Sequence, residues 1–362
     1  RRAAVMDNAF AVVAGTLSRD AARGVAAASE YGIAPDRAYA SIEAMIAGES
    51  ARPDGIEAVA IVTPNDLHHA QALAAIAAGL DVMIDKPVAN SVTEALDIAH
   101  AAGEAGVALG IAHGYSGYPM LREARALVAA GRIGALRMVQ VEYFGSGLAA
   151  RVEDAPDASR RWRLDPARSG PSLVLGDIGT HAHHLACFVA GQPFDAISAE
   201  VGTLMPGRRV QDYAQARFRL AGGARGSMVL CQGAAGAENH ILLRVFGADG
   251  HIEWRHAKHN ELRLAPLEGF PMTLSRGHPL LSAAATRATR FRRTGHPEGL
   301  HEAFANLYLD FAEQAAARRL AITPEPLAAD LPDARAGLDG LRFVEAALRS
   351  AARDGAWEAL AG

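Results

Sequence analysis

Cysteine is nearly absent from this chain, which has only Cys187 and Cys231 among 362 residues. Two thiols in separate apolar stretches do not make the disulfide framework of a small secreted domain, so a reducing, cytoplasmic compartment is predicted. An excess of charge of one sign is also absent, because 36 basic and 40 acidic residues give a formal net charge of -4. Without a basic surface, binding to nucleic acid or to an anionic membrane is not expected. The predicted ligands are small molecules.

Long apolar runs are missing as well, although 50% of the residues are hydrophobic. The longest stretches are alanine-rich and are interrupted by residues such as Gly79 and Asp81, which leaves none long enough to span a bilayer. Arg1-Arg2 is not followed by the continuous apolar segment and small-residue cleavage site of an export signal. The composition therefore predicts a soluble globular protein whose length suffices for two domains.

A glycine-rich phosphate-binding turn is the third absence. Dinucleotide-binding domains usually carry G-x-G-x-x-G after their first strand, and no such motif follows a strand near the start of this sequence. Residues 1–6 have the composition of the end of a helix, so the apolar segment 10–17 is predicted to be the second strand of such a domain. We predict that a segment of about ten to twenty residues, one strand and its glycine turn, precedes this sequence.

Strand and helix patterns alternate from residue 10 to residue 112, which is typical of a parallel sheet with helices on its faces. The predicted strands and the helices between them occupy 10–17, 20–31, 57–62, 65–79, 81–84, 91–105 and 107–112. Residues 1–118 are therefore predicted to form a Rossmann-type, doubly wound α/β domain whose first strand is missing.

The pattern changes after Pro119. A helix at 120–130 precedes a strand at 136–144, and beyond residue 195 strands follow one another with tight turns such as Ala221-Gly222-Gly223. This succession predicts an α+β domain over residues 119–332, built on a large, mainly antiparallel open sheet. Closing helices are predicted at 299–317 and 335–351, and the C-terminal part, 333–362, is predicted to pack back on the first domain.

Lys86 is the most informative residue of the first domain, because it follows the predicted strand 81–84 and precedes Pro87. In open α/β sheets, ligands bind at the carboxyl ends of the strands. Proline fixes its own φ and restricts the preceding residue, so this lysine is held in place. Taken alone, the stretch fits a surface turn as well as a catalytic site.

Asp177 and His181 are four residues apart, and on a helix this spacing puts them on one face. A carboxylate beside an imidazole orients the ring and stabilises the imidazolium, which makes a general-base pair. An N-cap aspartate with an incidental histidine explains the spacing alone equally simply. His181, His183 and His184 point in different directions on a helix and lack further ligands, so no metal site is predicted.

Candidate cofactor contacts lie at two other strand ends. Ser18 and Arg19 follow the segment 10–17, where this kind of domain binds the adenosine ribose. A serine and an arginine suit a 2′-phosphate better than an acidic residue does, which slightly favours NADP over NAD. Thr63-Pro64-Asn65 forms the turn after the strand 57–62, and His68 is predicted to line the nucleotide cleft beside it.

Together, four motifs resemble the Gfo/Idh/MocA family, named for glucose-fructose oxidoreductase and inositol dehydrogenase. They are Thr63-Pro64-Asn65 with His68, Asp85-Lys86-Pro87, Trp162-Arg163 and Asp177-x-Gly179-x-His181, and their order and spacing agree over nearly the whole chain. The resemblance implies a Rossmann domain followed by an α/β domain whose open sheet often forms a dimer or tetramer interface. A homo-oligomer is expected.

The resemblance also implies roles for individual residues. Lys86 is expected to contact both nicotinamide and substrate, and the peptide bond before Pro87 is often cis in such proteins. Asp85 replaces the glutamate that is usual in the family. His184 stands where the family often has an acidic residue. The implied cofactor contacts are Thr63, Pro64, Asn65, His68, Asp85, Lys86, Pro87, Trp162 and Arg163.

The function that follows is hydride transfer between NAD(P) and a secondary alcohol or ketone of a sugar, cyclitol or related polyol. His181 is the expected base, Asp177 its orienter, and Lys86 the cation that stabilises the developing charge on oxygen. A non-catalytic dinucleotide-binding regulator and a redox-assisted glycosidase or lyase are the alternatives on the same fold. Further candidate substrate contacts are Tyr115, Tyr143, His184 and His296.

Overall fold

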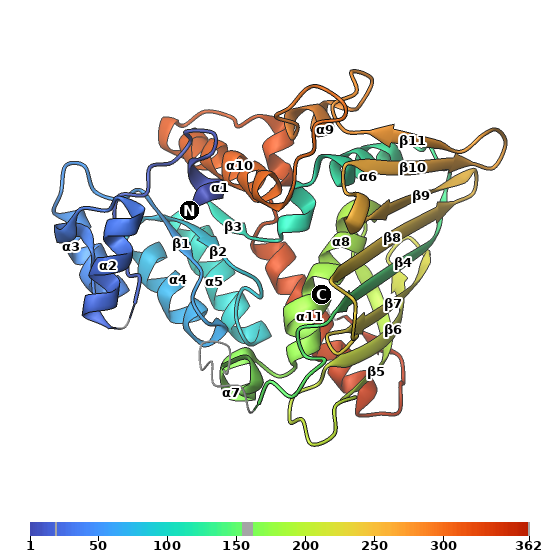
Figure 1. Ribbon diagram of the computed structural model, residues 1–362, viewed down its shortest axis with the longest axis horizontal. Coiled ribbons are helices and arrows are strands. Elements are labelled where there is room, and N and C mark those ends of the chain that lie inside the picture. The colour runs from blue at the N-terminus through green and yellow to red at the C-terminus, as the bar shows by residue number, and fades with distance from the viewer. Residues whose placement is uncertain (19, 154–161, 361–362) are drawn as a thin grey trace.

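The computed structural model describes residues 1–18, 20–153 and 162–360. The first part of the chain forms a small α/β unit, and the second part forms a large sheet (Figure 1). Helices α8 (Thr180–Ala190) and α11 (Ala334–Ala351) lie between the two.

The first unit is built on a parallel sheet in the order β1 (Ala58–Ile61), β2 (Asp81–Ile84) and β3 (Leu109–Ile111). All residues of β2 are buried, as expected for a central strand covered on both faces. Helices α4 (His68–Ala77) and α5 (Val92–Ala105) connect these strands. All three strands therefore end at the same edge, where the turns that follow them meet.

The sequence sets most helix ends of this unit by side-chain capping. Asp20, Ser41 and Ser91 each accept a hydrogen bond from a backbone N–H of the first turn, which that turn cannot satisfy internally. Helices α2 and α5 end at glycines with left-handed backbone, where a side chain would be strained. The other elements of this unit are α1 (Arg2–Val5), α2 (Ala21–Tyr31), the 3₁₀ turns η1 (Pro35–Arg37) and η2 (Asn65–Leu67), and α3 (Ile42–Ser50).

The strand predicted at 10–17 is not formed. This segment is extended and partly exposed, and its only sheet-like pairing is a single parallel bridge between Gly15 and Ala38. Backbone hydrogen bonds from Gly15 to Arg37 and from Tyr39 to Gly15 complete that bridge. Apolar composition gives a segment strand propensity, but a strand also needs a partner of matching length, and the segment around Ala38 supplies one residue only.

The second sheet has nine strands among the described residues, in the order β11-β10-β9-β8-β4-β7-β6-β5-β12. Only β4 and β7 pair in parallel, so the sheet is mainly antiparallel, as predicted. The strands are β4 (Leu136–Gly145), β5 (Phe194–Gly202), β6 (Tyr213–Leu220), β7 (Arg225–Cys231), β8 (Asn239–Gly247), β9 (Gly250–Arg255), β10 (Glu261–Pro266), β11 (Met272–Ser275) and β12 (Glu358–Ala359).

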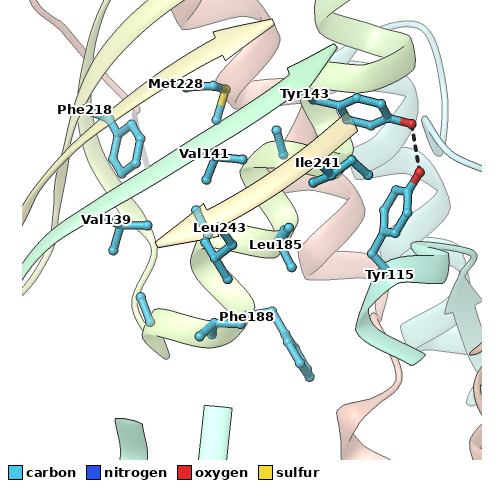
Figure 2. Close-up of a cluster of buried hydrophobic side chains, with 14 of the residues drawn as sticks. Tyr115, Val139, Val141, Tyr143, Leu185, Phe188, Phe218, Met228, Ile241 and Leu243 are labelled. Carbon is cyan, nitrogen blue, oxygen red and sulfur yellow. Dashed lines mark hydrogen bonds between the residues drawn. The ribbon is translucent and has the colours of Figure 1, made fainter. Parts of the chain in front are cut away.

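One face of this sheet carries the main hydrophobic core. Residues alternate along β4, so Val139, Val141 and Tyr143 are buried against the helices while their neighbours face outward. Figure 2 shows this core between the strands and α8. The opposite face has no helix over it in Figure 1.

Helix α11 packs on both halves of the chain. Leu338 and Leu341 belong to the core of the parallel sheet, whereas Phe343 and Val344 belong to the core of the large sheet. Its apolar residues thus join the two cores through one rigid element. The remaining elements are η3 (Gly114–Gly117), α6 (Pro119–Ala129), α7 (Pro166–Ser169), the π-helical turn η5 (Leu175–Gly179), η6 (His256–Lys258), α9 (Ala283–Arg287), α10 (Leu300–Leu320) and η7 (Pro326–Asp330). None of the helices in the described ranges has the length and apolar character needed to cross a bilayer.

A buried ion pair fastens α6 to α10. Arg122 donates to Asp310 over 2.6 Å, and both side chains are 1% exposed. We expect Arg122→Met to lower the free energy of unfolding by about 2 kcal/mol, because Asp310 loses a charged donor but keeps Arg287 as a partner. Urea unfolding should show the shift. Arg349→Met, which removes two partly exposed ion pairs of α11, with Glu345 and Glu358, is the control and should cost less than about 1 kcal/mol. Equal losses of unfolding free energy in the two variants would show that the buried Arg122–Asp310 pair contributes no more than an exposed pair.

Candidate active site

The carboxyl edge of the parallel sheet collects three polar turns. Thr63-Pro64-Asn65 follows β1, Lys86 follows β2 and His113 follows β3. Across from this edge lie η5 and the start of α8, which carry Asp177 and His181. The candidate site is therefore formed where the two halves of the chain meet.

Lys86 and Asp177 form the central contact of the site. The Lys86 ammonium donates to Oδ1 of Asp177 over 2.7 Å and to its backbone oxygen over 2.6 Å. Gln232, after β7, donates from Nε2 to the other carboxylate oxygen over 2.7 Å. The peptide bond between Lys86 and Pro87 is cis. Both oxygens of Asp177 thus have fixed donors.

The charge state of Asp177 follows from this arrangement. Burial raises the pKa of the carboxyl, but the Lys86 ammonium and its hydrogen bond lower it by more, so the pKa of Asp177 is about 2. Arg163 adds to the lowering. Asp177 is therefore a carboxylate at neutral pH, and Lys86 has a permanent counter-ion.

His181 lies beside this ion pair as a neutral ring. Burial and the Lys86 charge hold the pKa of His181 well below its usual value, while Asp177 opposes them. Its Nδ1 is buried and has no hydrogen-bond partner among the described residues. The Tyr115 ring meets it edge-on, with centroids 4.9 Å apart. A neutral imidazole is the form that accepts a proton.

The predicted hydrogen bond between Asp177 and His181 is not formed. The expectation assumed an α-helix, in which residues four apart share a face. The segment Leu175–Gly179 is instead a π-helical turn, whose hydrogen bonds join residues five apart. Lys86 and Gln232 occupy the two carboxylate oxygens of Asp177, so the role of orienter of His181 is not supported. π-helical turns are frequent at functional sites.

Two further histidines, His113 and His184, pack next to His181. His113 stacks on His184 with ring centroids 4.3 Å apart and meets His181 edge-on at 5.5 Å. His184 also stacks on Phe188, and burial lowers the pKa of His184 to about 3. Its neighbours on both sides are protein rings, which argues against the predicted substrate contact of His184.

Acidification is expected to destabilise the protein partly through His183, which lies against Phe194 and Phe343. Burial lowers the pKa of His183 to about 3. The unfolded chain binds this proton below about pH 6.5 and the folded chain only near pH 3, so stability falls as the pH drops between these values. In His183→Phe the slope of the unfolding free energy against pH should be smaller than in the wild type by up to about 1.4 kcal/mol per pH unit.

Urea unfolding between about pH 7 and pH 5 measures this slope. His100→Gln, at an exposed position of α5, is the matched control and should keep the wild-type slope. Parallel slopes for wild type and His183→Phe would show that the buried ring does not contribute.

Several predicted cofactor contacts are occupied by the protein itself. His68 is fully buried, and its ring nitrogens bond to the backbone oxygens of Pro87 and Thr63. It ties the β1 turn to the Lys86 turn and does not line a cleft. Asn65 donates to the backbone oxygen of Ser169, which joins the β1 turn to α7. The Thr63 hydroxyl donates to Gln71.

The other predicted cofactor contacts also interact with neighbouring residues of the chain. Asp85 accepts from the backbone N–H of Lys86, and the Arg163 guanidinium lies over the ring of Trp162 at 5.3 Å. Ser18 accepts from the backbone of Asp20 at the start of α2. Arg19 lies outside the described residues.

His296 was predicted to contact substrate, and it lies instead on the exposed segment 291–297, where its backbone oxygen accepts from Arg276. The sequence around a single histidine in a polar loop does not show whether that histidine lies near the active site.

Sequence reasoning missed Gln232, His113 and Asn239. His113 follows β3 in the same way that Lys86 follows β2, so the strand-end rule could have found it. Gln232 comes from the other sheet, and only the chain's tertiary contacts bring it to Asp177. Asn239, at the start of β8, donates to the Tyr115 hydroxyl over 3.2 Å.

Polar groups surround the Lys86–Asp177 pair. Among the described residues, no group of three or more His, Cys, Asp or Glu side chains is placed to hold a metal. Buried polar atoms without partners do surround the Lys86–Asp177 pair, namely Nδ1 of His181, Nδ1 of His113 and Oε1 of Gln232. Unpaired buried polar atoms are costly, and a functional role is one reason that a native protein keeps them.

Comparisons with known proteins agree with this geometry. Residues 1–113 match the oxidoreductase family with an NAD-binding Rossmann fold, and residues 121–253 match the GFO/IDH/MocA C-terminal domain. The uncharacterized oxidoreductase YfiI of Bacillus subtilis (strain 168) is 34% identical over 368 residues, which cover 99% of this chain and 91% of the relative.

Solved structures of similar proteins also match this fold. The inositol dehydrogenase homolog of Azotobacter vinelandii, complexed with NAD+, is 34% identical and superposes with a TM-score of 0.93 over 99% of this chain and 92% of that one. Its complex with NADH and myo-inositol gives a TM-score of 0.90 over the same shares. The predicted fold class and the family resemblance are thereby confirmed. The chain belongs to the Gfo/Idh/MocA family of NAD-binding oxidoreductases and is a dehydrogenase or reductase.

Proposed function

We propose that this enzyme transfers a hydride between a nicotinamide dinucleotide and the secondary alcohol of a cyclic polyol or sugar. The Lys86–Asp177 ion pair carries the proposal, because it joins the carboxyl edge of the Rossmann sheet to the helix that bears a neutral His181. A cation and a base at that edge are the two groups that alcohol oxidation requires.

The proposed chemistry assigns one role to each residue. Bound nicotinamide supplies the hydride acceptor or donor, and the Thr63–Asn65 turn and Lys86 lie at the edge where such domains hold it. In the oxidative direction the alcohol O–H proton passes to His181, the carbon loses its hydrogen with the bonding pair, and a C=O bond forms. Lys86 donates a hydrogen bond to that oxygen as its charge develops, and Asp177 holds Lys86 in position.

The substrate class is supported by the relatives. The Azotobacter vinelandii homolog was solved with myo-inositol, and levoglucosan dehydrogenase of Pseudarthrobacter phenanthrenivorans is 28% identical over 59% of this chain. Both names denote ring compounds with several oxygens. The polar atoms around Lys86 suit such a ring better than an apolar alcohol.

For the cofactor we propose NADP slightly ahead of NAD, on the basis of Ser18 and Arg19. Relatives differ in this respect, since one homolog was solved with NAD+ and another relative is an NADP+-dependent scyllo-inositol dehydrogenase of Bacillus subtilis. A dimer or tetramer through the outer face of the large sheet is the proposed assembly, because exposed apolar residues such as Met138 lie on that face.

The test is a turnover screen of the purified protein. Cyclic polyols and sugars are offered with NAD+ and NADP+, and reduction is followed by absorbance. We expect turnover of at least one cyclic polyol with both cofactors and a higher kcat/KM with NADP+. Turnover of simple secondary alcohols only, or of none, would overturn the substrate class. A preference for NAD+ would overturn the cofactor assignment alone.

A further inference from the structure

Two tyrosines and an asparagine meet beside His181 at one end of the large sheet. The hydroxyls of Tyr115 (η3) and Tyr143 (β4) are 2.8 Å apart, and Figure 2 shows them pointing toward each other at the margin of the core. Asn239 donates from Nδ2 to the Tyr115 oxygen over 3.2 Å. The Tyr115 ring is in edge contact with His181. The three residues thus border the reacting centre.

Counting hydrogens shows that this group is incomplete. Each tyrosine carries one O–H hydrogen, and burial, together with Tyr115, raises the pKa of Tyr143, which keeps its hydroxyl protonated. The tyrosine–tyrosine bond uses one of the two hydrogens, and the Asn239 contact uses none because the amide is the donor. Whichever tyrosine donates to the other, one O–H hydrogen has no acceptor among the described residues.

The surroundings restrict what can accept this hydrogen. Tyr115 is 8% exposed and Tyr143 is 7% exposed, so only a small part of each residue faces the solvent. A buried donor without an acceptor is unfavourable, and a ligand oxygen at this place removes the cost. The Asp177 charge contributes to the raised pKa of Tyr143 and the Tyr115 ring contacts His181, so the pair lies close to the candidate catalytic groups.

We propose that the Tyr115–Tyr143 pair donates its remaining hydrogen to a second oxygen of the substrate, beyond the oxygen that is oxidised. The pair thereby selects ring compounds with several oxygens over simple secondary alcohols. Asn239 is the positioning residue, because its amide occupies one lone pair of Tyr115. The inference rests on the proposed function and deepens it, since it assigns the source of polyol selectivity.

The test compares substrates across single-atom variants. The probes are myo-inositol, or the cyclic polyol turned over fastest, and its analogues that each lack one hydroxyl. In the wild type one analogue should lose about tenfold in kcat/KM relative to the polyol. Tyr143→Phe and Tyr115→Phe are compared on both substrates. The Phe variant of the tyrosine that donates to the substrate should lose about tenfold on the polyol and stay within about twofold of wild type on that analogue, whereas the other single variant should lose less because the remaining hydroxyl keeps its hydrogen. A merely structural role would lower both substrates alike.

Two further variants sharpen the result. Because the two hydroxyls are coupled, the double Phe variant should lose no more than the more affected single variant. Tyr118→Phe is the matched control, since Tyr118 packs on Tyr115 but its hydroxyl is already bonded to His256. It should leave the polyol-to-analogue ratio unchanged.

The outcomes separate this inference from the proposed function. If the wild type turns over polyols but the Phe variants keep the wild-type ratio for every analogue, or lose activity equally on all of them, only the role of the pair is wrong. If the wild type neither turns over nor binds any cyclic polyol, the proposed function is wrong and the inference is wrong with it.

Discussion

Replacing Lys86 with methionine is expected to lower kcat by about 100- to 1,000-fold on the best polyol substrate. Methionine keeps an unbranched apolar stem that ends where the lysine Cε lies, and it removes the ammonium that faces Asp177. The developing charge on the substrate oxygen then loses its donor. Without the ammonium to oppose it, burial raises the pKa of the Asp177 carboxyl from about 2. The site also loses the positive charge of Lys86. Steady-state rates at saturating cofactor and substrate measure the effect.

Lys258→Met is the matched control for this experiment. Lys258 is the only other lysine of the chain, its side chain is 70% exposed, and its only ion-pair partner within the described residues is Glu261 at 4.0 Å. Exposed pairs of this kind contribute little. The control should keep the wild-type kcat within about twofold. A Lys86→Met enzyme with kcat reduced by less than about tenfold would show that this lysine is not the catalytic cation.

The strand-end rule explains why Lys86 was predictable from sequence. The strand Asp81–Ile84 is observed with the predicted bounds, since its fully apolar interior and the glycine before it specify a buried parallel strand. Because parallel strands end at one edge, any polar residue after such a strand becomes a candidate without knowledge of the tertiary fold. Lys86 was found in this way, and His113 lay within reach of the same argument.

Long-range pairing explains what the sequence could not predict. The segment 10–17 has strand composition but finds only Ala38 as a partner, and Asp177 has helical spacing to His181 but lies in a π-helical turn. Gln232 reaches Asp177 from a sheet whose strand order is not readable from local patterns. Local propensity describes each segment alone, whereas these contacts depend on which distant segments of the chain pack against one another.

The position of the ion pair has a consequence for the enzyme as a whole. Lys86 follows a strand of the parallel sheet and Asp177 belongs to the element leading into α8, so the proposed catalytic ion pair exists only when the two halves are docked. Helix α11 belongs to both cores and fixes that docking. The chemistry of the site therefore depends on the packing between the halves as much as on its own residues.

His181→Asn is expected to lower kcat by about 100- to 10,000-fold, because asparagine can hydrogen-bond to the substrate but cannot take its proton. Burial and Lys86 hold the pKa of His181 well below its usual value, so the wild-type ring is neutral from weakly acidic to alkaline pH and kcat should be flat across that range. Acidification should reduce kcat only when the ring is finally protonated. In the variant the rate should instead rise steadily with pH, since hydroxide replaces the missing base. His183→Phe, on the same helix, should keep the flat wild-type profile, and a flat profile with near-normal kcat for His181→Asn would assign the proton to another group.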